Sequence, residues 1–260
     1  MPGSRKNFRT LVRRLRFSDA DRSERNHHIA ARIFGESKTI QGPDFRAISG
    51  ADLRCIFDLY DQQYFDRRLN LALNDTPLEF RVSSRMTRAG GKTGFWRKNR
   101  NSPIERLEIA VSSTLLFQTF SGEQTDHKIR VTGVECYTRL DALMRIMEHE
   151  LVHLAELLGW NESSCRRDRF QTVAWQVFGH TDHRHALITP RDRAAAAGVR
   201  PGRQVRFEFQ GETLNGIVNR VTRRATVLVP ESDGELFSDG ITYRRYYVPI
   251  RMLEPVKDNG

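Results

Sequence analysis

The sequence predicts an α+β protein in which a helix-rich part with a short sheet precedes a smaller part made of strands. Three observations support this prediction. Residues 138–158 have the strongest helical period of apolar residues. Residues 78–85, 93–97 and 106–112 have the pattern of strands, and residues 196–256 contain short apolar runs separated by turn residues. A chain of 260 residues is long enough for two such parts, each with its own core.

The composition argues against a membrane-spanning or secreted, disulfide-rich protein and favours one that binds a polyanion. No run of about 18 apolar residues is present, so we expect no membrane span, and the N-terminus lacks the apolar stretch of a secretory signal. Three scattered cysteines favour a reducing, cytoplasmic location over a disulfide framework. The formal net charge of +10 favours a polyanionic partner such as DNA, and with that partner the protein would associate with the nucleoid. The sequence indicates no oligomeric state.

Residues 1–50 are predicted to form a basic N-terminal arm. They contain 11 Lys or Arg and 5 Asp or Glu. Apolar residues with helical spacing lie among these cations and are Phe8, Leu11, Val12 and Leu15. We expect a partly disordered segment whose charged face is solvated. The alternative is a basic amphipathic helix that folds on a membrane surface or on nucleic acid.

Residues 51–190 are expected to form the main domain. Apolar periodicity predicts helices over 51–69, 138–158 and 165–178. Alternation predicts strands over 78–85, 93–97 and 106–112, of which the first two are joined as a hairpin around a Gly-Gly turn. The second helix is expected to end at Gly159, and the third to begin at a cap from Ser163 or Ser164.

Residues 196–256 are predicted to form a small closed β-barrel after an Ala-rich connector at 191–199. Short apolar runs there have the length of strands, and turn residues separate them. The runs are centred on Phe207, Ile217, Val227 and Val248.

The motif with the clearest chemistry is His149-Glu150-Leu151-Val152-His153, an HExxH pattern in the middle of the 138–158 helix. Residues four apart lie on one face of a helix, so the two imidazoles can bind one Zn²⁺. Glu150 is rotated by about 100° from His149 and can sit beside a metal-bound water without binding the metal. There it would take a proton from the water and pass it to a leaving amine. The alternative is a pair of histidines on a solvated helix face.

A catalytic zinc needs a third protein ligand and an open position. We prefer Cys165, because a helix N-terminus and neighbouring arginines lower a thiol pKa and favour the thiolate that zinc binds. His180 lies roughly 20 Å farther along the same predicted helix, so it cannot readily share an ion with Cys165. Further candidates for the third ligand are Asp168, His183 and His185.

Four segments stand in a characteristic order in this chain: 59–65 (LYDQQYF), 80–85 (FRVSSR) before a Gly-rich turn, 107–111 (LEIAV) and the HELVH motif. Over residues 50–180 they resemble the SprT-like metalloprotease family, which includes the Spartan-type proteases. The resemblance implies a small zincin-like fold of helices packed on a short sheet. It also implies zinc-dependent cleavage of proteins, with DNA-bound or DNA-crosslinked proteins as substrates. The predicted barrel lies outside it and resembles an SH3-like or KOW-type module.

Part of the family's site can be matched to this chain residue by residue. His149 and His153 match the family's first two zinc ligands, and Glu150 matches its catalytic acid and base. The family's third ligand is a His four residues before an aromatic; Phe170 matches the aromatic, and Arg166 stands at the ligand position. Arginine has no lone pair to offer a metal, so the neighbouring cysteine or a residue from elsewhere has to replace it.

A basic segment over 81–100 contains no acidic residue. Phe95 and Trp96 are interleaved with its cations, and such an arrangement can follow a phosphate backbone and stack a base. The cations we assign to nucleic-acid binding are Arg85, Arg88, Lys92, Arg97 and Lys98. In the alternative interpretation the two aromatics belong to the core and the cations form a solvated rim. The predicted barrel allows the same two interpretations, a nucleic-acid-binding surface or a solvated rim around core aromatics. The residues concerned are Arg220, Arg223, Arg224, Arg244 and Arg245, with Tyr243 and Tyr246.

These observations predict a zinc-dependent peptidase with Glu150 as general base and acid, acting on protein substrates that include DNA-associated proteins. An extended substrate is expected to pair with the strand at 106–112. Glu156 shares a helix face with His149, where it orients a ligand or remains a solvated charge. The alternative function is a non-enzymatic protein that binds nucleic acid or a partner and holds a structural zinc closed by four protein ligands.

Overall fold

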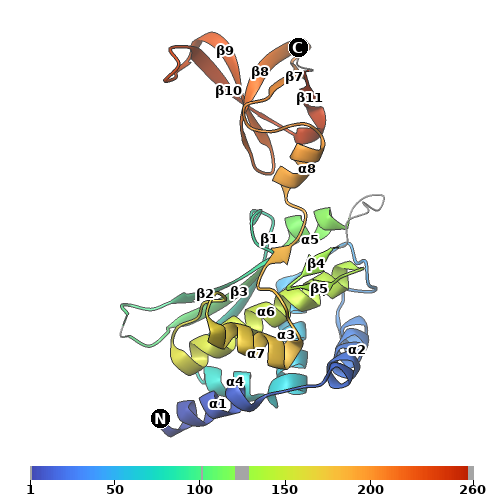
Figure 1. Cartoon of the computed structure of the whole chain (residues 1–260), viewed down its shortest axis with the longest axis vertical. Coiled ribbons are helices and arrows are strands. Elements are labelled where there is room, and N and C mark those ends of the chain that lie inside the picture. Colours follow the sequence, from blue (N-terminus) through green and yellow to red (C-terminus); the bar gives the residue numbers. More distant parts are fainter. Residues whose placement is uncertain (1, 101, 121–128, 257–260) are drawn as a thin grey trace. The chain divides into compact units, whose positions relative to one another are not determined.

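The computed structural model describes residues 2–100, 102–120 and 129–256. Within them the chain is mixed α+β, with eight α-helices and three sheets. It divides into two compact units, Met1–Leu187 and Ile188–Gly260 (Figure 1). The second unit begins before residue 196, because helix α8 (Pro190–Ala196) packs Ala194 into the core of that unit. Among the described residues, no helix combines the length and the apolar character needed to cross a membrane.

The helices of the first unit surround α6, which is the longest of them and carries the HExxH motif. Helix α6 packs against α1, α3, α7 and strand β2. Several helices begin with a capping box, in which a Ser or Thr and an Asp three residues later bond to each other's backbone N–H. The helices are α1 (Pro2–Arg14), α2 (Asp19–Glu36), α3 (Gly50–Phe65), α4 (Arg68–Leu73), α5 (Ser113–Thr119), α6 (Arg139–Trp160) and α7 (Asp168–Phe178).

The N-terminal helices belong to the core of the first unit, which corrects the prediction of a separate, partly disordered arm over 1–50. Val12 of α1 and Ile29 and Ile33 of α2 are fully buried in the same apolar cluster as α3 and α6. The Arg9 side chain of α1 also donates a hydrogen bond to the carbonyl of Gly159, 2.5 Å away. The apolar stripe seen in the sequence is therefore covered by the protein's own helices.

Helix α6 continues two residues beyond its expected end at residue 158. Trp160 is its last residue, and Asn161 follows in the left-handed conformation with φ 59°. Gly159 therefore lies inside the helix, and the prediction that it ends the helix is wrong. Asparagine adopts this conformation at lower cost than most residues, so the cap falls two positions later, at Asn161.

The first sheet has the order β1-β3-β2, in which β1 (Leu78–Ser83) is parallel to β3 (Arg106–Ser112) and β2 (Gly91–Trp96) is antiparallel to it. The predicted hairpin of the first two strands is therefore wrong. Strand β3 carries fully buried apolar residues, which favours the centre of a sheet over its edge. Strands β1 and β2 pair with the two edges of β3, so the prediction that an extended substrate pairs with residues 106–112 is wrong. Strands β1 and β2 are the two edge strands of this sheet, and β2 is the one that packs against α6.

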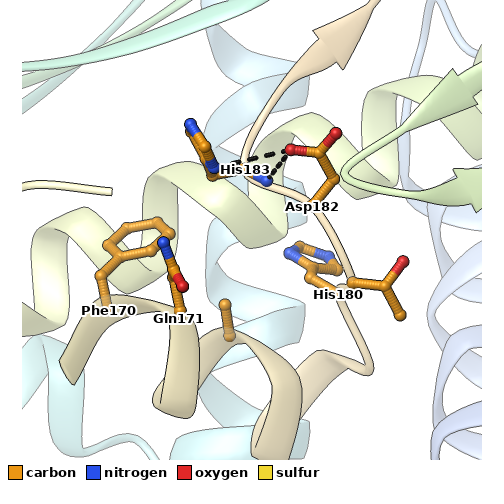
Figure 2. Close-up of a pocket in the computed structure, with 7 residues that line it drawn as sticks. Phe170, Gln171, His180, Asp182 and His183 are labelled. Atoms are coloured by element: carbon orange, nitrogen blue, oxygen red, sulfur yellow. Dashed lines mark hydrogen bonds and ion pairs between the residues drawn. The ribbon is translucent and has the colours of Figure 1, made fainter. Parts of the chain in front are cut away.

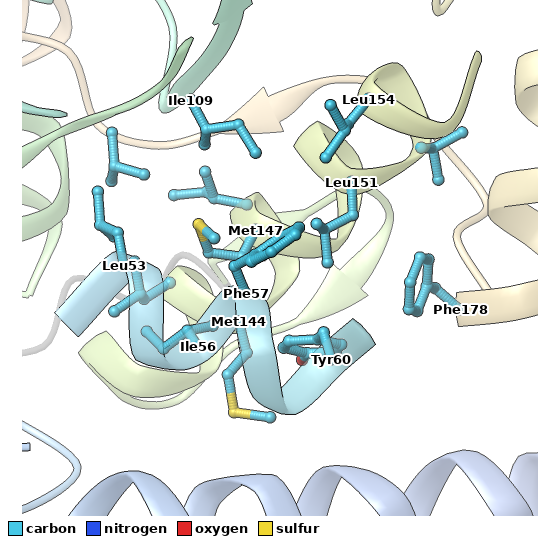
Figure 3. Packing of buried hydrophobic residues seen from close by; sticks show 14 of the residues in the cluster. Leu53, Ile56, Phe57, Tyr60, Ile109, Met144, Met147, Leu151, Leu154 and Phe178 are labelled. Atoms are coloured by element: carbon cyan, nitrogen blue, oxygen red, sulfur yellow. The ribbon is translucent and has the colours of Figure 1, made fainter. Parts of the chain in front are cut away.

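The core behind α6 fixes the position of the HExxH helix. Figure 3 shows Leu53 and Phe57 of α3 packed with Met144 and Met147 of α6, below Ile109 of β3. These side chains are almost completely buried. Burial of each large apolar side chain is worth roughly 1.5–3 kcal/mol, so α6 is held firmly on this side.

A small sheet and helix α7 complete the first unit. The sheet has the order β5-β4-β6, with β4 (Arg130–Val131), β5 (Val134–Glu135) and β6 (His185–Ala186). Helix α7 begins at Asp168, so Cys165 lies in the turn before it rather than in its first turn. Its N-cap is Arg167, without a side-chain hydrogen bond, and neither Ser163 nor Ser164 caps it as predicted.

Among its described residues, the second unit contains one five-stranded sheet with the order β10-β9-β8-β7-β11. Its edge strands β10 and β11 do not pair with each other, so the predicted closed barrel is not found. Strand β11 is only two residues long and pairs with β7. Val205, Val218 and Val227 are buried on its core face. The strands are β7 (Gln204–Phe209), β8 (Glu212–Val221), β9 (Ala225–Leu236), β10 (Thr242–Val248) and β11 (Glu254–Pro255), with a 3₁₀ turn at Ile250–Met252.

Candidate metal centre

The two histidines of the HExxH motif face the interior of the first unit. Their ring centroids are 4.9 Å apart, as expected one turn apart on α6. His149 is buried and His153 is half-buried. Phe170 of α7 packs on both rings, with centroid distances of 4.9 Å to His149 and 4.5 Å to His153. The alternative of two histidines on a solvated face does not fit this packing.

Cys165 comes within reach of both histidines. One ring nitrogen of His149, one of His153 and the Cys165 Sγ all lie within 4.8 Å of one another. The expectation that a helix N-terminus lowers the pKa of this thiol is wrong, however, because Cys165 precedes α7 and burial raises its pKa. What brings it to the site is the turn between α6 and α7.

The other candidates for a third ligand are not part of the group formed by His149, His153 and Cys165. Asp168 is exposed at the start of α7. His180 is buried, and its Nε2 bonds to a carboxylate oxygen of Glu148 at 2.8 Å. His183 lies beside Asp182, with 3.5 Å between its Nδ1 and a carboxylate oxygen. His185 of β6 joins a second group of possible ligand atoms.

This second group contains His149, Glu150 and His185, whose ligand atoms also lie within 4.8 Å of one another. The ring centroids of His149 and His185 are 4.6 Å apart. His149 therefore stands between two sets of donors, with His153 and Cys165 in one and Glu150 and His185 in the other. Its own Nδ1 is buried and has no hydrogen-bond partner among the described residues, as a buried metal-binding nitrogen would before an ion is bound.

Burial keeps the histidines of the centre in the neutral form that binds metals. It lowers the pKa of His153 to about 4 and that of His185 to about 3, and it moves the pKa of His149 in the same direction. Neutral imidazole has a lone pair for a cation, whereas imidazolium has none.

Glu150 is buried beside the histidines and is held by strand β2. The Thr93 hydroxyl donates to Glu150 Oε2 at 2.8 Å. Gly91 leaves room for the same carboxyl group, because a Cβ at that position would lie 2.5 Å from Glu150 Oε1. Burial raises the pKa of Glu150 to about 8, although the hydrogen bond from Thr93 acts against it. A carboxyl group with this pKa can both take and return a proton near neutral pH.

A partly buried chain of hydrogen bonds orients His153. The Ser163 hydroxyl donates to Glu156 Oε2 at 2.7 Å, so its oxygen is left to accept from His153 Nδ1, also at 2.7 Å. Arg169 of α7 donates to the other oxygen of Glu156 at 2.6 Å. This pattern places the proton of His153 on Nδ1 and leaves the Nε2 lone pair for a metal. Of the two interpretations of Glu156, the structure supports the orienting role, because its side chain is completely buried.

A second buried network lies behind the motif. Glu148 accepts hydrogen bonds from Tyr60 of α3 at 2.8 Å and from His180, and it forms an ion pair with Arg145 at 2.9 Å. Sequence reasoning missed Glu148, Tyr60 and Arg145. Nothing in local spacing links Tyr60 to α6, since 88 residues separate it from Glu148. The network ties α6 to α3 and to the segment after α7.

A pocket of about 110 Å³ lies next to the centre and shares Phe170 with it. Figure 2 shows Phe170 and Gln171 on α7 and His180, Asp182 and His183 on the segment that returns from α7. Its lining combines the apolar Phe170 and Ala174 with polar side chains that include Gln171, Thr181 and Asp182.

The basic residues of the 81–100 segment are exposed in most cases. Phe95 and Trp96 are 38% and 41% exposed, so they do not belong to the core. The Arg97 guanidinium lies 5.0 Å from the Phe95 ring centroid. Arg81 is paired with Glu108 at 2.8 Å. The cations that remain exposed are Arg85, Arg88, Lys92, Lys98 and Arg100, whereas Arg97 is half-buried.

In the second unit, the basic residues divide into two groups. Arg244 forms ion pairs with Glu231 and Asp233, and Arg245 pairs with Glu235. Tyr243 is buried. The exposed cations that remain from the predicted set are Arg220, Arg223 and Arg224, at the β8–β9 turn.

Comparisons with models of known protein families, with curated proteins and with solved structures find no match for this chain. The case for a function rests on the geometry of the centre. That geometry consists of two imidazoles and a thiol within reach of one ion, a buried carboxyl group beside them and a free strand edge next to α6.

Proposed function

We propose that the first unit is a zinc-dependent peptidase. The observation that carries the proposal is the convergence of His149, His153 and Cys165, with Glu150 next to the pair of histidines. Two imidazole nitrogens and a thiolate are a donor set that zinc accepts, and three protein ligands leave one position for water. The hydrogen bond to Ser163 supports the assignment, because it leaves the Nε2 of His153 free for the metal.

Zinc, when bound, lowers the pKa of a water ligand and polarises a carbonyl group. Glu150 is the group that moves the proton. It takes a proton from the attacking water, whose oxygen bonds to the carbonyl carbon of the peptide, and it returns that proton to the amine as the C–N bond breaks. Thr93 holds the carboxyl group in place by its hydrogen bond to Oε2.

The same unit offers places for a protein substrate. We propose that an extended peptide adds to the free edge of β2, which packs against α6, and that one of its side chains enters the pocket next to Phe170. The exposed cations and aromatics around β2 favour DNA-associated proteins as substrates, in the cytoplasm and at the nucleoid. Membership of the SprT-like family, with a zincin-like fold and an SH3-like second unit, belongs to this proposal.

The second candidate is a non-enzymatic protein that binds nucleic acid or a partner and holds a structural zinc. One observation favours it, since His185 lies close to His149 and would close the coordination shell as a fourth protein ligand. The buried position of Glu150 next to the same histidine favours the peptidase, because a structural zinc needs no proton carrier.

The test compares wild type with Glu150→Gln, which keeps the size of the side chain and removes its ability to take a proton. Zinc is measured in both purified proteins, and cleavage of an unfolded protein is followed with and without single- and double-stranded DNA. We expect both proteins to hold about one zinc per chain. Cleavage should fall by about 10²–10⁴ in the variant, the contribution of a general base.

A chelator should abolish cleavage by wild type, and added zinc should restore it. Equal cleavage by wild type and Glu150→Gln would refute the role of Glu150. A zinc-loaded wild type that cleaves nothing, with or without DNA, would favour the structural alternative.

A further inference from the structure

His185 is the one histidine near the centre that has no role in the proposal above. It lies on β6, far along the chain from the HExxH motif, and its ring is inclined by 78° to that of His149 at a centroid distance of 4.6 Å. One of its nitrogens lies within 4.8 Å of both a Glu150 oxygen and a His149 nitrogen. It therefore stands on the side of His149 where Glu150 acts.

The backbone holds His185 in this position. Strand β6 pairs with β4, and His185 is opposite Val131. The backbone at Gly90 passes directly against the ring, since a Cβ there would lie 3.0 Å from His185 Nδ1. A side chain at residue 90 would push the imidazole and the Leu187 side chain aside by a few tenths of an ångström, so glycine at this position lets the ring lie where it does.

The Nε2 of His185 is buried and has no hydrogen-bond partner among the described residues. A buried polar atom without a partner is destabilising, so its persistence calls for an explanation. A partner that arrives with the substrate supplies that explanation.

His185 belongs to a different group of possible ligand atoms from His153 and Cys165. Within the described residues, its ligand atoms group with His149 and Glu150, while His153 and Cys165 group with His149 on their own. The carboxyl group that accompanies His185 is the one to which the proposed function assigns the proton transfer. A peptide bond that reacts next to Glu150 would therefore lie close to His185.

We propose that His185 donates a hydrogen bond from its neutral imidazole to the carbonyl oxygen of the peptide bond that is cleaved. The inference rests on the proposed peptidase function and adds a substrate-binding residue to it. As water adds to the carbonyl carbon, negative charge develops on that oxygen. A fixed N–H donor in a buried site stabilises this charge more than it stabilises the uncharged carbonyl, so it raises kcat rather than only lowering KM.

The experiment uses His185→Leu, which fills the site without a donor, and His185→Gln, which retains an N–H group. The matched control is His27→Gln, at an exposed position of α2. We expect His185→Leu to lower kcat by about 10²–10³ while KM changes little, which is the usual effect of losing one such donor. His185→Gln should recover part of the loss, and the control should cleave as wild type does.

The second readout does not depend on activity. Zinc content is measured in every variant, and the protein is loaded with Co²⁺, whose visible spectrum reports the number of ligands. We expect unchanged zinc content and an unchanged cobalt spectrum for His185→Leu. Loss of zinc or a lower coordination number in that variant would overturn the proposal and make His185 a ligand.

The two proposals fail in different ways. If wild type cleaves and His185→Leu cleaves at the same rate, the role of His185 is refuted and the peptidase function stands. If zinc-loaded wild type cleaves nothing, the peptidase function is refuted and the role of His185 falls with it. If His185→Gln behaves as His185→Leu does in kcat but both retain zinc and fold, a donor role is also contradicted.

Discussion

His153 is the metal-binding side chain that the structure supports in most detail. Its Nδ1 bonds to Ser163, and Ser163 in turn bonds to the buried carboxylate of Glu156, which is paired with Arg169. The sequence predicts His153 as a ligand because it follows His149 by only four residues on the same helix. It does not predict Ser163, whose local context at the start of a helix indicated a cap instead. The role of a short polar side chain depends on which distant residues surround it after folding.

Glu156→Gln should weaken zinc binding by about 10–100-fold, the typical effect of removing a carboxylate behind a histidine ligand. The amide would accept the Ser163 hydrogen bond less strongly and would leave Arg169 without its buried partner. Zinc affinity is measured by competition with a chromophoric chelator. The control is Glu162→Gln, an exposed carboxylate that also contacts Arg169, at 3.6 Å. Equal affinity in the two variants would contradict the orienting role of Glu156.

At the scale of elements, local pattern and long-range pairing differ in how well they can be predicted. The helix that carries the motif follows from its 3.6-residue period and from the Thr138 capping box. Strand alternation located β1, β2 and β3, but it could not show that β3 inserts between the other two. Strand order depends on contacts between segments far apart in sequence, which alternation does not encode. The same limit explains the missed docking of α1 and α2.

The junction of α2 and α3 gives a prediction about pH. Asp52 is buried and accepts hydrogen bonds from Ser37 at the end of α2 and from Ser49 at the start of α3. Burial alone would raise the pKa of Asp52, but the hydrogen bonds from Ser37, Ser49 and Thr39 outweigh it, so the pKa is lowered. A group whose pKa is lower in the folded state stabilises the fold above its unfolded pKa of about 3.9.

Asp52→Asn should therefore reduce the free energy of unfolding by about 1–3 kcal/mol at pH 7, because an amide nitrogen replaces one acceptor. The difference from wild type should shrink as the pH falls below about 4, since wild type then loses the charge of Asp52. Urea unfolding at several pH values measures both effects. A difference that stays constant down to acid pH would contradict this account. Asp58→Asn, on the exposed side of α3, is the control.

At the scale of the whole molecule, the net charge of +10 is distributed in a way that the sequence shows only in part. Several arginines that count toward it are neutralised by ion pairs, among them Arg81, Arg244 and Arg245. Charge clusters are visible in the sequence, whereas the acidic partners of these residues are brought to them by strand pairing. The exposed cations outside these ion pairs are therefore the ones available to a polyanion.

Replacement of Arg88, Lys92 and Lys98 by Gln should weaken DNA binding and reduce its dependence on salt. Each lost phosphate contact lowers the slope of log K against log salt by about 0.9 for duplex DNA and about 0.7 for single strands. Fluorescence anisotropy at several salt concentrations measures the slope. The control replaces the ion-paired Arg244 and Arg245 by Gln and should leave it unchanged. Equal slopes for wild type and the triple variant would show that these cations do not contact phosphate.

The central claim is that α6 and the turn before α7 hold one zinc ion and leave a position open for reaction. A crystal structure of the zinc-loaded protein, with anomalous data collected at the zinc edge, tests it directly. We predict one ion bound by His149, His153 and Cys165, at about 2.0–2.1 Å from nitrogen and about 2.3 Å from sulfur, with water in the fourth position. An ion closed by His185 as a fourth protein ligand, or no ion between the two histidines, would contradict the account.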